Sequence, residues 1–176
     1  YSTISHVGFI LMGFIAGTVD GLRASMFYTL TYVLMAAAAF GLIIALSRKG
    51  FESDNLEDFK GLNGRSPWLA LMMLIVMFSM AGVPPFVGFY AKLAVLGSVL
   101  DAGLFWLAII GIVFAVIGAF YYIRVVWYMY FTESSDSSTI KLSPDLRFLL
   151  SANVLALLVF GLFPGFLLDI CSRVLL

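Results

Sequence analysis

Long apolar runs dominate the chain, and short polar stretches separate them. Five runs cover residues about 4–19, 24–46, 67–100, 104–131 and 146–168. A helix that crosses a bilayer needs about 20 apolar residues. The strands of a membrane barrel would instead alternate apolar and polar positions. Because the runs are continuous, the pattern predicts an all-α fold, a polytopic bundle of five transmembrane helices.

Polar stretches set the predicted boundaries of these spans. Residues 20–23 ("DGLR") and 100–103 ("LDAG") are predicted to be tight turns, whereas 47–66 and 132–145 are long polar loops. The first run is short for a span, and the chain neither begins with Met nor carries the basic segment of a signal peptide. We therefore expect residues 1–176 to be a single transmembrane domain cut from a longer chain.

Basic residues favour one orientation of the bundle. The two long loops and their borders hold most of them, namely Arg48, Lys49, Lys60, Arg65, Lys141 and Arg147. The opposite side has only Arg23 and Arg173. Since cytoplasmic loops carry an excess of Lys and Arg, we expect both long loops to be cytoplasmic and the C-terminus to lie outside.

Composition agrees with a membrane protein and excludes several kinds of chemistry. Hydrophobic residues make up 62% of the chain and charged residues 11%, against roughly 45–50% and about 25% in soluble domains. The net charge is zero, so nothing indicates a nucleic-acid partner. Cys171 is the only cysteine, which excludes an internal disulfide or a cysteine metal cluster. No phosphate loop or dinucleotide fingerprint is present, so we expect no metal or cofactor site in this chain.

The third apolar run is too long for one span, and "GVPPFVGFYAKLAV" (82–95) interrupts it. Pro84 and Pro85 remove backbone donors and clash with the preceding turn, and Gly82 and Gly88 lie on either side. In hydrocarbon an unpaired backbone group costs several kcal/mol, so such a break survives only inside protein or beside a wet cavity. Broken helices of this kind form ion and substrate sites in transporters.

Lys92 follows the break by seven residues and is the candidate proton carrier. One interpretation is a snorkelling side chain whose amine reaches the membrane surface. The next polar turn, at Asp101, is however about 13 Å of helix away. The other interpretation is an amine that faces the bundle interior and marks a proton pathway. Because burial disfavours the charged amine, it could take up and release a proton as its surroundings change.

Other polar residues could assist this proton carrier. His6, the only histidine, suits a proton relay, and a structural, hydrogen-bonded histidine is the alternative. The hydroxyl residues that share a stripe of the second span, or flank the break, are Ser25, Tyr28, Thr29, Tyr32, Ser79 and Tyr90. They are candidates for lining a water chain, and the alternative is ordinary hydrogen bonding between helices.

Three stretches together closely resemble the antiporter-like membrane subunits of respiratory complex I, in particular the N type: "YSTISHVGFILMG", "FKGLNGRSPWLALMMLIVMFSMAGVPPFVGFYAKLAVL" and "YYIRVVWYMY". The resemblance covers nearly the whole chain. It implies the last five helices of a fourteen-helix fold, which form the second of two inverted repeats, each with one broken helix. Lys92 then occupies the family's protonatable position on the broken helix, and His6 matches a histidine of its central polar axis.

The resemblance implies a function for the longer chain. We expect a proton-translocating membrane subunit of NADH:quinone oxidoreductase, which couples quinone reduction to proton transfer through a lysine, histidine and water relay. The alternative is a subunit of a multisubunit sodium/proton antiporter, which shares the fold. A scaffold without transport would leave Lys92 unexplained. Because the first repeat is absent, this chain alone is not expected to pump protons.

The resemblance also implies partners and a location. The parent complex uses FMN, iron–sulfur clusters, NADH and a quinone, and none of these is expected to bind this chain. The expected partners are the other membrane-arm subunits, the lipid bilayer, protons and internal water. The expected location is the bacterial inner membrane.

Overall fold

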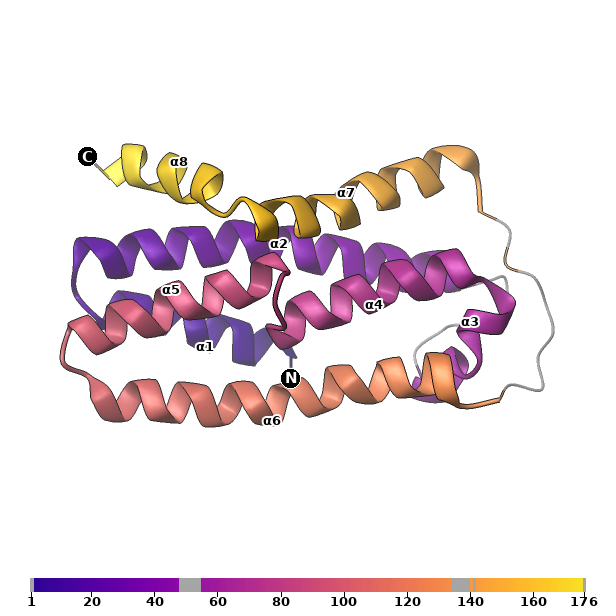
Figure 1. Ribbon diagram of the computed structural model, residues 1–176, viewed down its shortest axis with the longest axis horizontal. Helices are drawn as coiled ribbons and strands as arrows, with labels where there is room; N and C mark the ends of the chain where they lie inside the picture. Colours follow the sequence, from indigo (N-terminus) through magenta and orange to yellow (C-terminus); the bar gives the residue numbers. More distant parts are fainter. Residues whose placement is uncertain (1, 48–54, 134–139, 141, 176) are drawn as a thin grey trace.

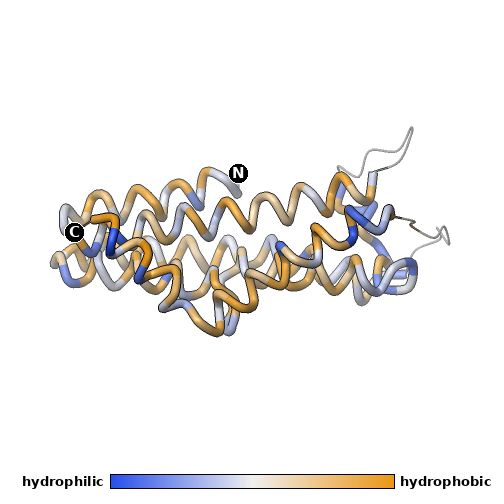
Figure 2. Tube along the Cα trace, turned by 90° about the horizontal axis from the view of Figure 1, so that it is seen from above, coloured by the Kyte–Doolittle hydropathy of each residue, from blue (hydrophilic) through white to orange (hydrophobic). Residues whose placement is uncertain are grey.

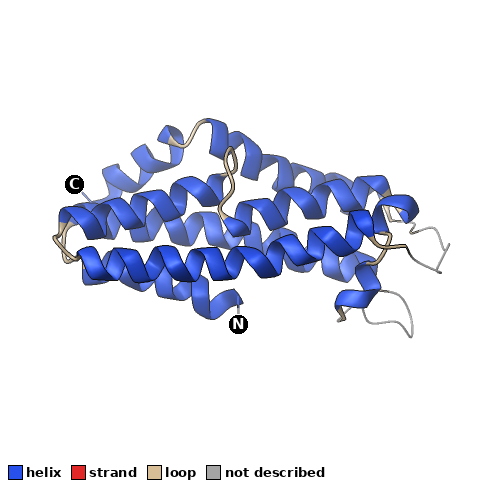
Figure 3. Cartoon of the chain, turned by 60° about the horizontal axis from the view of Figure 1, so that its bottom comes forward, coloured by secondary structure: helices blue, strands red, loops and turns tan. Residues whose placement is uncertain are grey.

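The computed structural model describes residues 2–47, 55–133, 140 and 142–175, and within these residues every regular element is a helix (Figure 3). The predicted all-α class is therefore confirmed for the described part of the chain. Parts of both predicted loops, with Arg48, Lys49 and Lys141, lie outside the described residues. The elements are α1 (Ser2–Ile15), α2 (Val19–Leu46), the 3₁₀ helix η1 (Leu56–Phe59), α3 (Leu62–Arg65), α4 (Pro67–Ala81), α5 (Val87–Asp101), α6 (Phe105–Phe131), α7 (Pro144–Leu162) and α8 (Gly165–Leu175).

The long helices run along one common direction and form a bundle around α2 (Figure 1). Helices α1, α4, α5, α7 and α8 all pack against α2, whereas α6 packs on α4, α5 and α1 from the other side. Phe27, Met35 and Leu42 of α2 are fully buried at the centre of this core. Helix α2 is therefore the element against which these five helices are positioned.

Polar residues gather at the two ends of the bundle, and apolar residues fill its length (Figure 2). One end holds the α1–α2 and α5–α6 turns and the end of α8. The opposite end holds α3, the ends of α2 and α6, and the start of α7. This grouping is the one that the predicted orientation requires. Which end faces the cytoplasm stays a prediction.

Three helices, α2, α6 and α7, are long and apolar enough to cross a membrane, judged by length and composition among the described residues. Helices α1 and α4 are apolar but shorter. On α6 many large apolar side chains point outward; Trp106, Phe114 and Phe120 are examples. The five-span arrangement needs α1 and the pair α4–α5 as two further crossings, and it stays a prediction.

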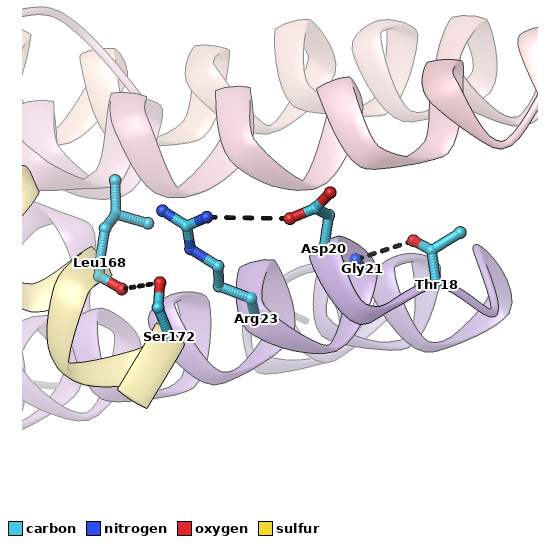
Figure 4. Close-up of polar contacts among 6 residues, drawn as sticks. All are labelled: Thr18, Asp20, Gly21, Arg23, Leu168 and Ser172. Carbon is cyan, nitrogen blue, oxygen red and sulfur yellow. Dashed lines mark hydrogen bonds and ion pairs between the residues drawn. The ribbon is translucent and has the colours of Figure 1, made fainter. Parts of the chain in front are cut away.

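The turn predicted at residues 20–23 is wrong, because these residues form the first turn of α2. The hydroxyl of Thr18 accepts a hydrogen bond from the Gly21 amide at 3.0 Å and caps the helix there (Figure 4). Asp20 lies 3.8 Å from Arg23 within the same turn (Figure 4). The chain reverses instead just before Thr18, at Gly17, whose φ of 66° is left-handed.

The last predicted run, 146–168, consists of two helices rather than one. Helix α7 ends at Leu162, and Pro164 lies in the junction before α8. A proline cannot donate to the preceding turn and ends a helix readily. Helix α8 continues from α7 toward the end of the bundle where α2 begins (Figure 1), and it packs on α2. Figure 4 shows Ser172 of α8 beside Arg23 of α2.

Two glycines allow the helices to approach closely where α4 gives way to α5. A Cβ atom at Gly88 would overlap the backbone carbonyl of Ser79 in α4. A Cβ atom at Gly161 would overlap backbone atoms of Pro85, Phe86 and Val87, so α7 covers the junction. Larger residues at these positions would push the three segments apart.

We predict that Gly88→Ala destabilises the protein by about 1–3 kcal/mol, because the added methyl group cannot fit against α4. Gly97→Ala is the matched control on the same helix, since nothing lies within 4 Å of a Cβ there. Alanine favours a helix by about 0.5–1 kcal/mol over glycine, so the control should unfold at an equal or higher temperature. Thermal unfolding in detergent measures both variants, and equal behaviour would contradict the packing argument.

Candidate functional site

The α4–α5 junction, residues 82–86, lies near the middle of the length of the bundle (Figure 1). Helix α4 stops at Ala81, and Gly82 follows with a left-handed φ of 85°. The Pro84–Pro85 peptide bond is cis. A helix that stops leaves its last four carbonyl groups without helical partners, so the end of α4 presents acceptors inside the bundle.

Lys92 of α5 supplies donors to two of these carbonyls. Its Nζ donates to the oxygen of Met80 at 3.0 Å and to that of Ala81 at 2.8 Å. The amides of Gly82 and Val83 bond the other two carbonyls, those of Phe78 and Ser79. All four terminal carbonyls of α4 are thus bonded, and Lys92 is only 9% exposed. This geometry favours the interior-facing interpretation of Lys92 over snorkelling.

A hollow of about 390 Å³ adjoins the Lys92 side chain. Its wall consists of the end of α4, one face of α5 and apolar residues of α6, among them Ala115 and Ala119. A Cβ atom at Gly82 would lie 3.0 Å from Cδ and 3.3 Å from Nζ of Lys92. The absence of a side chain at Gly82 therefore leaves room for the Lys92 amine. One water molecule occupies about 30 Å³ in the liquid. The hollow is therefore large enough for water molecules beside Lys92, although most of its wall is apolar.

His6 forms a second buried polar cluster on the neighbouring helix α1. Its Nδ1 lies 2.9 Å from the hydroxyl of Tyr28, and its Nε2 lies 3.1 Å from the hydroxyl of Tyr122. The imidazole stacks on the ring of Tyr32 at 4.7 Å between centroids. The Tyr122 hydroxyl also lies 2.5 Å from the Ser2 hydroxyl. Ser2, Tyr122, His6 and Tyr28 therefore form a continuous line of groups that can each donate and accept a proton.

Phe9 separates the His6 cluster from Lys92. Its ring stacks on Tyr28 with 5.7 Å between centroids and an interplanar angle of 5°. The Nζ atom of Lys92 lies 5.6 Å from the centroid of the same ring. Such a contact between an ammonium group and a ring face is attractive. A proton that passes between His6 and Lys92 needs water, or a movement of Phe9, to cross this apolar ring.

The remaining hydroxyl candidates have different roles. Ser25 donates to the Ile10 carbonyl of α1 at 2.8 Å, and the Ser79 hydroxyl accepts from the Gly88 amide at 3.3 Å. Both are hydrogen bonds between helices. Thr29 bonds the carbonyl of Ser25 on its own helix, and the Tyr90 ring packs on Phe89. Of the predicted stripe, only Tyr28 and Tyr32 contact His6.

Sequence reasoning missed Phe9, Tyr122 and Gly161 as parts of the site. Tyr122 lies in an aromatic stretch typical of a membrane interface, and 116 residues separate it from His6. Phe9 falls in an unbroken apolar run without a distinguishing neighbour. The four-residue spacing of Tyr28 and Tyr32 was the signal for one shared face. Nothing in the sequence indicated which helix would pack against the face that carries Tyr28 and Tyr32.

No group of three or more His, Cys, Asp or Glu side chains that could hold a metal ion occurs among residues 2–47, 55–133, 140 and 142–175. The polar groups of the site are instead an amine, an imidazole, hydroxyls and backbone carbonyls. The amine, the imidazole and the hydroxyls can transfer protons, whereas the carbonyls only accept hydrogen bonds.

Comparisons with known proteins point to one family. Residues 1–118 match the family described as NADH:quinone oxidoreductase/Mrp antiporter, TM. The chain is 56% identical over 172 residues to NADH-quinone oxidoreductase subunit N of Thioalkalivibrio sulfidiphilus, covering 98% of this chain and 36% of the relative. It is 58% identical over 172 residues to the subunit N of Methylovorus glucosotrophus, with 98% and 36% covered. The chain thus spans little more than a third of these relatives.

Solved structures share the fold. A chain of respiratory complex I from Thermus thermophilus with bound aureothin superposes with a TM-score of 0.82 at 28% identity, over 96% of this chain and 38% of that chain. A chain of the Mrp complex from Dietzia sp. DQ12-45-1b also gives 0.82, at 24% identity, over 99% and 41%. The second likeness shows the fold alone.

We predict that Tyr122→Phe destabilises the protein by about 1–3 kcal/mol, because it leaves a buried nitrogen of His6 without its partner. Tyr121→Phe is the matched control, since Tyr121 is 62% exposed and surface changes stay within about 0.5 kcal/mol. Thermal unfolding of the purified protein in detergent measures both. Equal unfolding temperatures for the two variants would show that the Tyr122 hydroxyl does not hold His6.

Proposed function

This chain belongs to the NADH:quinone oxidoreductase/Mrp antiporter transmembrane family, and from that premise we propose that it is part of a proton-translocating subunit of respiratory complex I. The resemblance seen in the sequence is confirmed, since the relatives with 53–58% identity are subunits N of NADH-quinone oxidoreductase. The activity of the whole protein is part of the proposal, because the chain spans 36% of the first relative.

The observation that carries the proposal is the buried amine of Lys92 on the carbonyls of an interrupted helix. A buried ionisable group in a membrane protein is costly and generally marks a proton or ion pathway. The carbonyl ends of broken helices line such pathways in transporters. Lys92 is then the residue that accepts and releases the proton, and the adjoining hollow supplies the water that delivers it.

The His6 cluster supplies the proton on one side of Lys92. A proton that enters at Ser2 can pass through Tyr122 and His6 to Tyr28 by successive hydrogen-bond transfers. Phe9 then prevents direct contact with Lys92, so transfer occurs only when water bridges the ring. A barrier of this kind would allow quinone reduction elsewhere in the complex to control the step.

The grouping of the helix ends supports a membrane arrangement of five spans, with α4 and α5 together as the third. In this proposed arrangement the two long loops lie in the cytoplasm and the C-terminus lies outside the bacterial inner membrane. The outward apolar face of α6 meets lipid or another membrane-arm subunit. A cluster with four iron-bound thiolates does not fit a chain with one cysteine. We propose that the iron–sulfur clusters bind other subunits for this reason, and that the FMN, NADH and quinone of the complex bind other subunits as well.

A subunit of a multisubunit sodium/proton antiporter is the second candidate. A chain of the Mrp complex superposes with the same TM-score of 0.82, so the fold of this chain is compatible with this candidate. In that protein Lys92 would exchange protons against sodium without an electron donor. The high identity to subunits N favours the first candidate.

We predict that Lys92→Met, introduced into the assembled complex in proteoliposomes, slows proton transfer at this site about 100-fold or more, the usual contribution of a proton-transferring side chain. Proton uptake per NADH oxidised and coupled turnover should both fall. Lys60→Met is the control, because Lys60 pairs with Glu57 at the loop end of the bundle.

Two further measurements separate the candidates. The Lys92→Met complex must purify with the same subunits as the unmodified complex and keep normal electron transfer to an artificial acceptor, which together show that it has assembled. Replacing sodium by choline should leave proton uptake of the unmodified complex unchanged, whereas the antiporter candidate requires a loss. Normal pumping and turnover in an assembled Lys92→Met complex would rule out Lys92 as the carrier.

A further inference from the structure

The hollow beside Lys92 also has the character of a ligand site. Its volume of about 390 Å³ falls within the range of about 300–1,000 Å³ that small-molecule sites occupy. Such sites are mostly apolar and hold a few well-placed polar groups. Here apolar residues of α5, α6 and the α4–α5 junction surround one amine. The hollow therefore suits a molecule with one polar group and an apolar body.

Lys92 has one donor left for such a molecule. An ammonium group carries three hydrogens, and the carbonyls of Met80 and Ala81 accept two of them. The described residues supply no third acceptor, and the ring face of Phe9 lies 5.6 Å from Nζ. An anionic oxygen in the hollow would therefore complete the hydrogen bonding of the amine.

No acidic side chain of the surrounding helices takes that place. Helices α1, α4 and α6 contain no acidic residue. Asp101 of α5 follows Lys92 by nine residues, about two and a half turns, so it lies on the opposite face of the helix. Asp20 of α2 and Asp145 of α7 lie in the first turns of their helices, at opposite ends of the bundle (Figure 1). The other described acidic residues lie in η1, after α6 or in α8, namely Glu57, Asp58, Glu133 and Asp169. Within the described residues the charged amine therefore has no counter-ion.

The hollow opens toward the outside of the bundle near the middle of its length. Leu93 of α5 and Val116 of α6 line it and are 53% and 68% exposed, and the adjoining α4–α5 junction lies near mid-length (Figure 1). In the proposed membrane position this depth is hydrocarbon, about 15 Å from either headgroup region. The charged phosphate of a phospholipid does not reach so deep. A single-chain carboxylic acid does, because it can enter hydrocarbon in its neutral form.

We propose that this hollow binds a long-chain fatty acid, with its carboxyl group at Lys92 and its acyl chain leaving between α5 and α6. The neutral acid gives its proton to the neutral amine, so that its O–H bond breaks and a further N–H bond forms. The resulting carboxylate and ammonium pair carries no net charge. Because each charge stabilises the other, the bound acid holds Lys92 in its charged form and blocks release of the proton. This last consequence rests on the proposed function of Lys92, whereas binding does not.

A photoactivatable palmitic acid tests the proposal in nanodiscs that contain the assembled complex. We expect labelling within residues 89–96 and 112–119, located by mass spectrometry. Ala115→Leu fills the hollow from α6 and leaves the amine in place, so it should reduce this labelling about tenfold. Ala152→Leu is the matched control, because it makes the same change at an exposed position of α7 that does not line the hollow. It should be labelled like the unmodified complex.

Further arms test the role of the charge. Lys92→Met should also reduce the labelling about tenfold or more, the effect of losing a charge-assisted contact. Unlabelled palmitic acid should compete, while its methyl ester, which cannot ionise, and phosphatidylglycerol should not. Unchanged labelling in either variant, or equal competition by the ester or by phosphatidylglycerol, would overturn the proposal.

Turnover separates failure of this inference from failure of the proposed function. NADH oxidation by the unmodified complex is measured in proteoliposomes with an uncoupler present, so that protons carried by the fatty acid itself have no effect. Palmitic acid should lower the rate, and its methyl ester should not. Labelling of the hollow without loss of turnover would support the site and contradict proton transfer by Lys92. Loss of turnover without labelling of the hollow would overturn the site.

Discussion

The hydrogen bonds from Lys92 to the carbonyls of Met80 and Ala81 are the interaction on which the centre of this structure depends. A helix interrupted in an apolar bundle exposes carbonyl groups, and each would cost several kcal/mol if left unpaired in hydrocarbon. The amine removes that cost, and the carbonyls in turn stabilise an amine that would otherwise be buried without partners. Each of the two, the break and the lysine, thus offsets part of the cost of burying the other. Their mutual satisfaction explains why a charge-bearing side chain and two prolines occur together in the middle of an apolar sequence.

Close packing holds this pair in position. Gly88 lets the start of α5 touch the end of α4, and Gly161 lets α7 lie directly on the junction. Gly82 leaves the space that the Lys92 side chain crosses. The three glycines, which have no side chain, therefore shape the site as much as its polar groups do. Any widening of these contacts would lengthen the two hydrogen bonds of Lys92, because they connect α5 to α4 across the same gap.

The sequence predicted the helical class well, since continuous apolar runs have strong local consequences. A double proline favours an interruption, and α4 ends at Ala81 and α5 begins at Val87 on either side of it; a single span broken there stays a prediction. The sequence also indicated Lys92 and His6 as candidate proton carriers; both are buried, and their roles stay predictions. The predicted start of α2 was wrong because Asp20-Gly21 has the composition of a turn, whereas in the structure the Thr18 hydroxyl caps the helix there. The contacts of His6 with Tyr122 and of Lys92 with Phe9 could not be predicted. They depend on which helices become neighbours, and periodicity reports only which face of a helix is buried.

The partners of Lys92 also bear on how its proton could be controlled. Within the described residues, ion pairs join Asp20 with Arg23 and Glu57 with Lys60, and neither involves Lys92. A carboxylate partner would stabilise the charged amine strongly and hold the proton. Backbone carbonyls are neutral acceptors, and they can bond the amine whether it carries two hydrogens or three. The geometry can therefore persist through a proton cycle. In the proposed function, a change of charge or hydration nearby, across Phe9 or in the hollow beside α6, would control which protonation state Lys92 adopts.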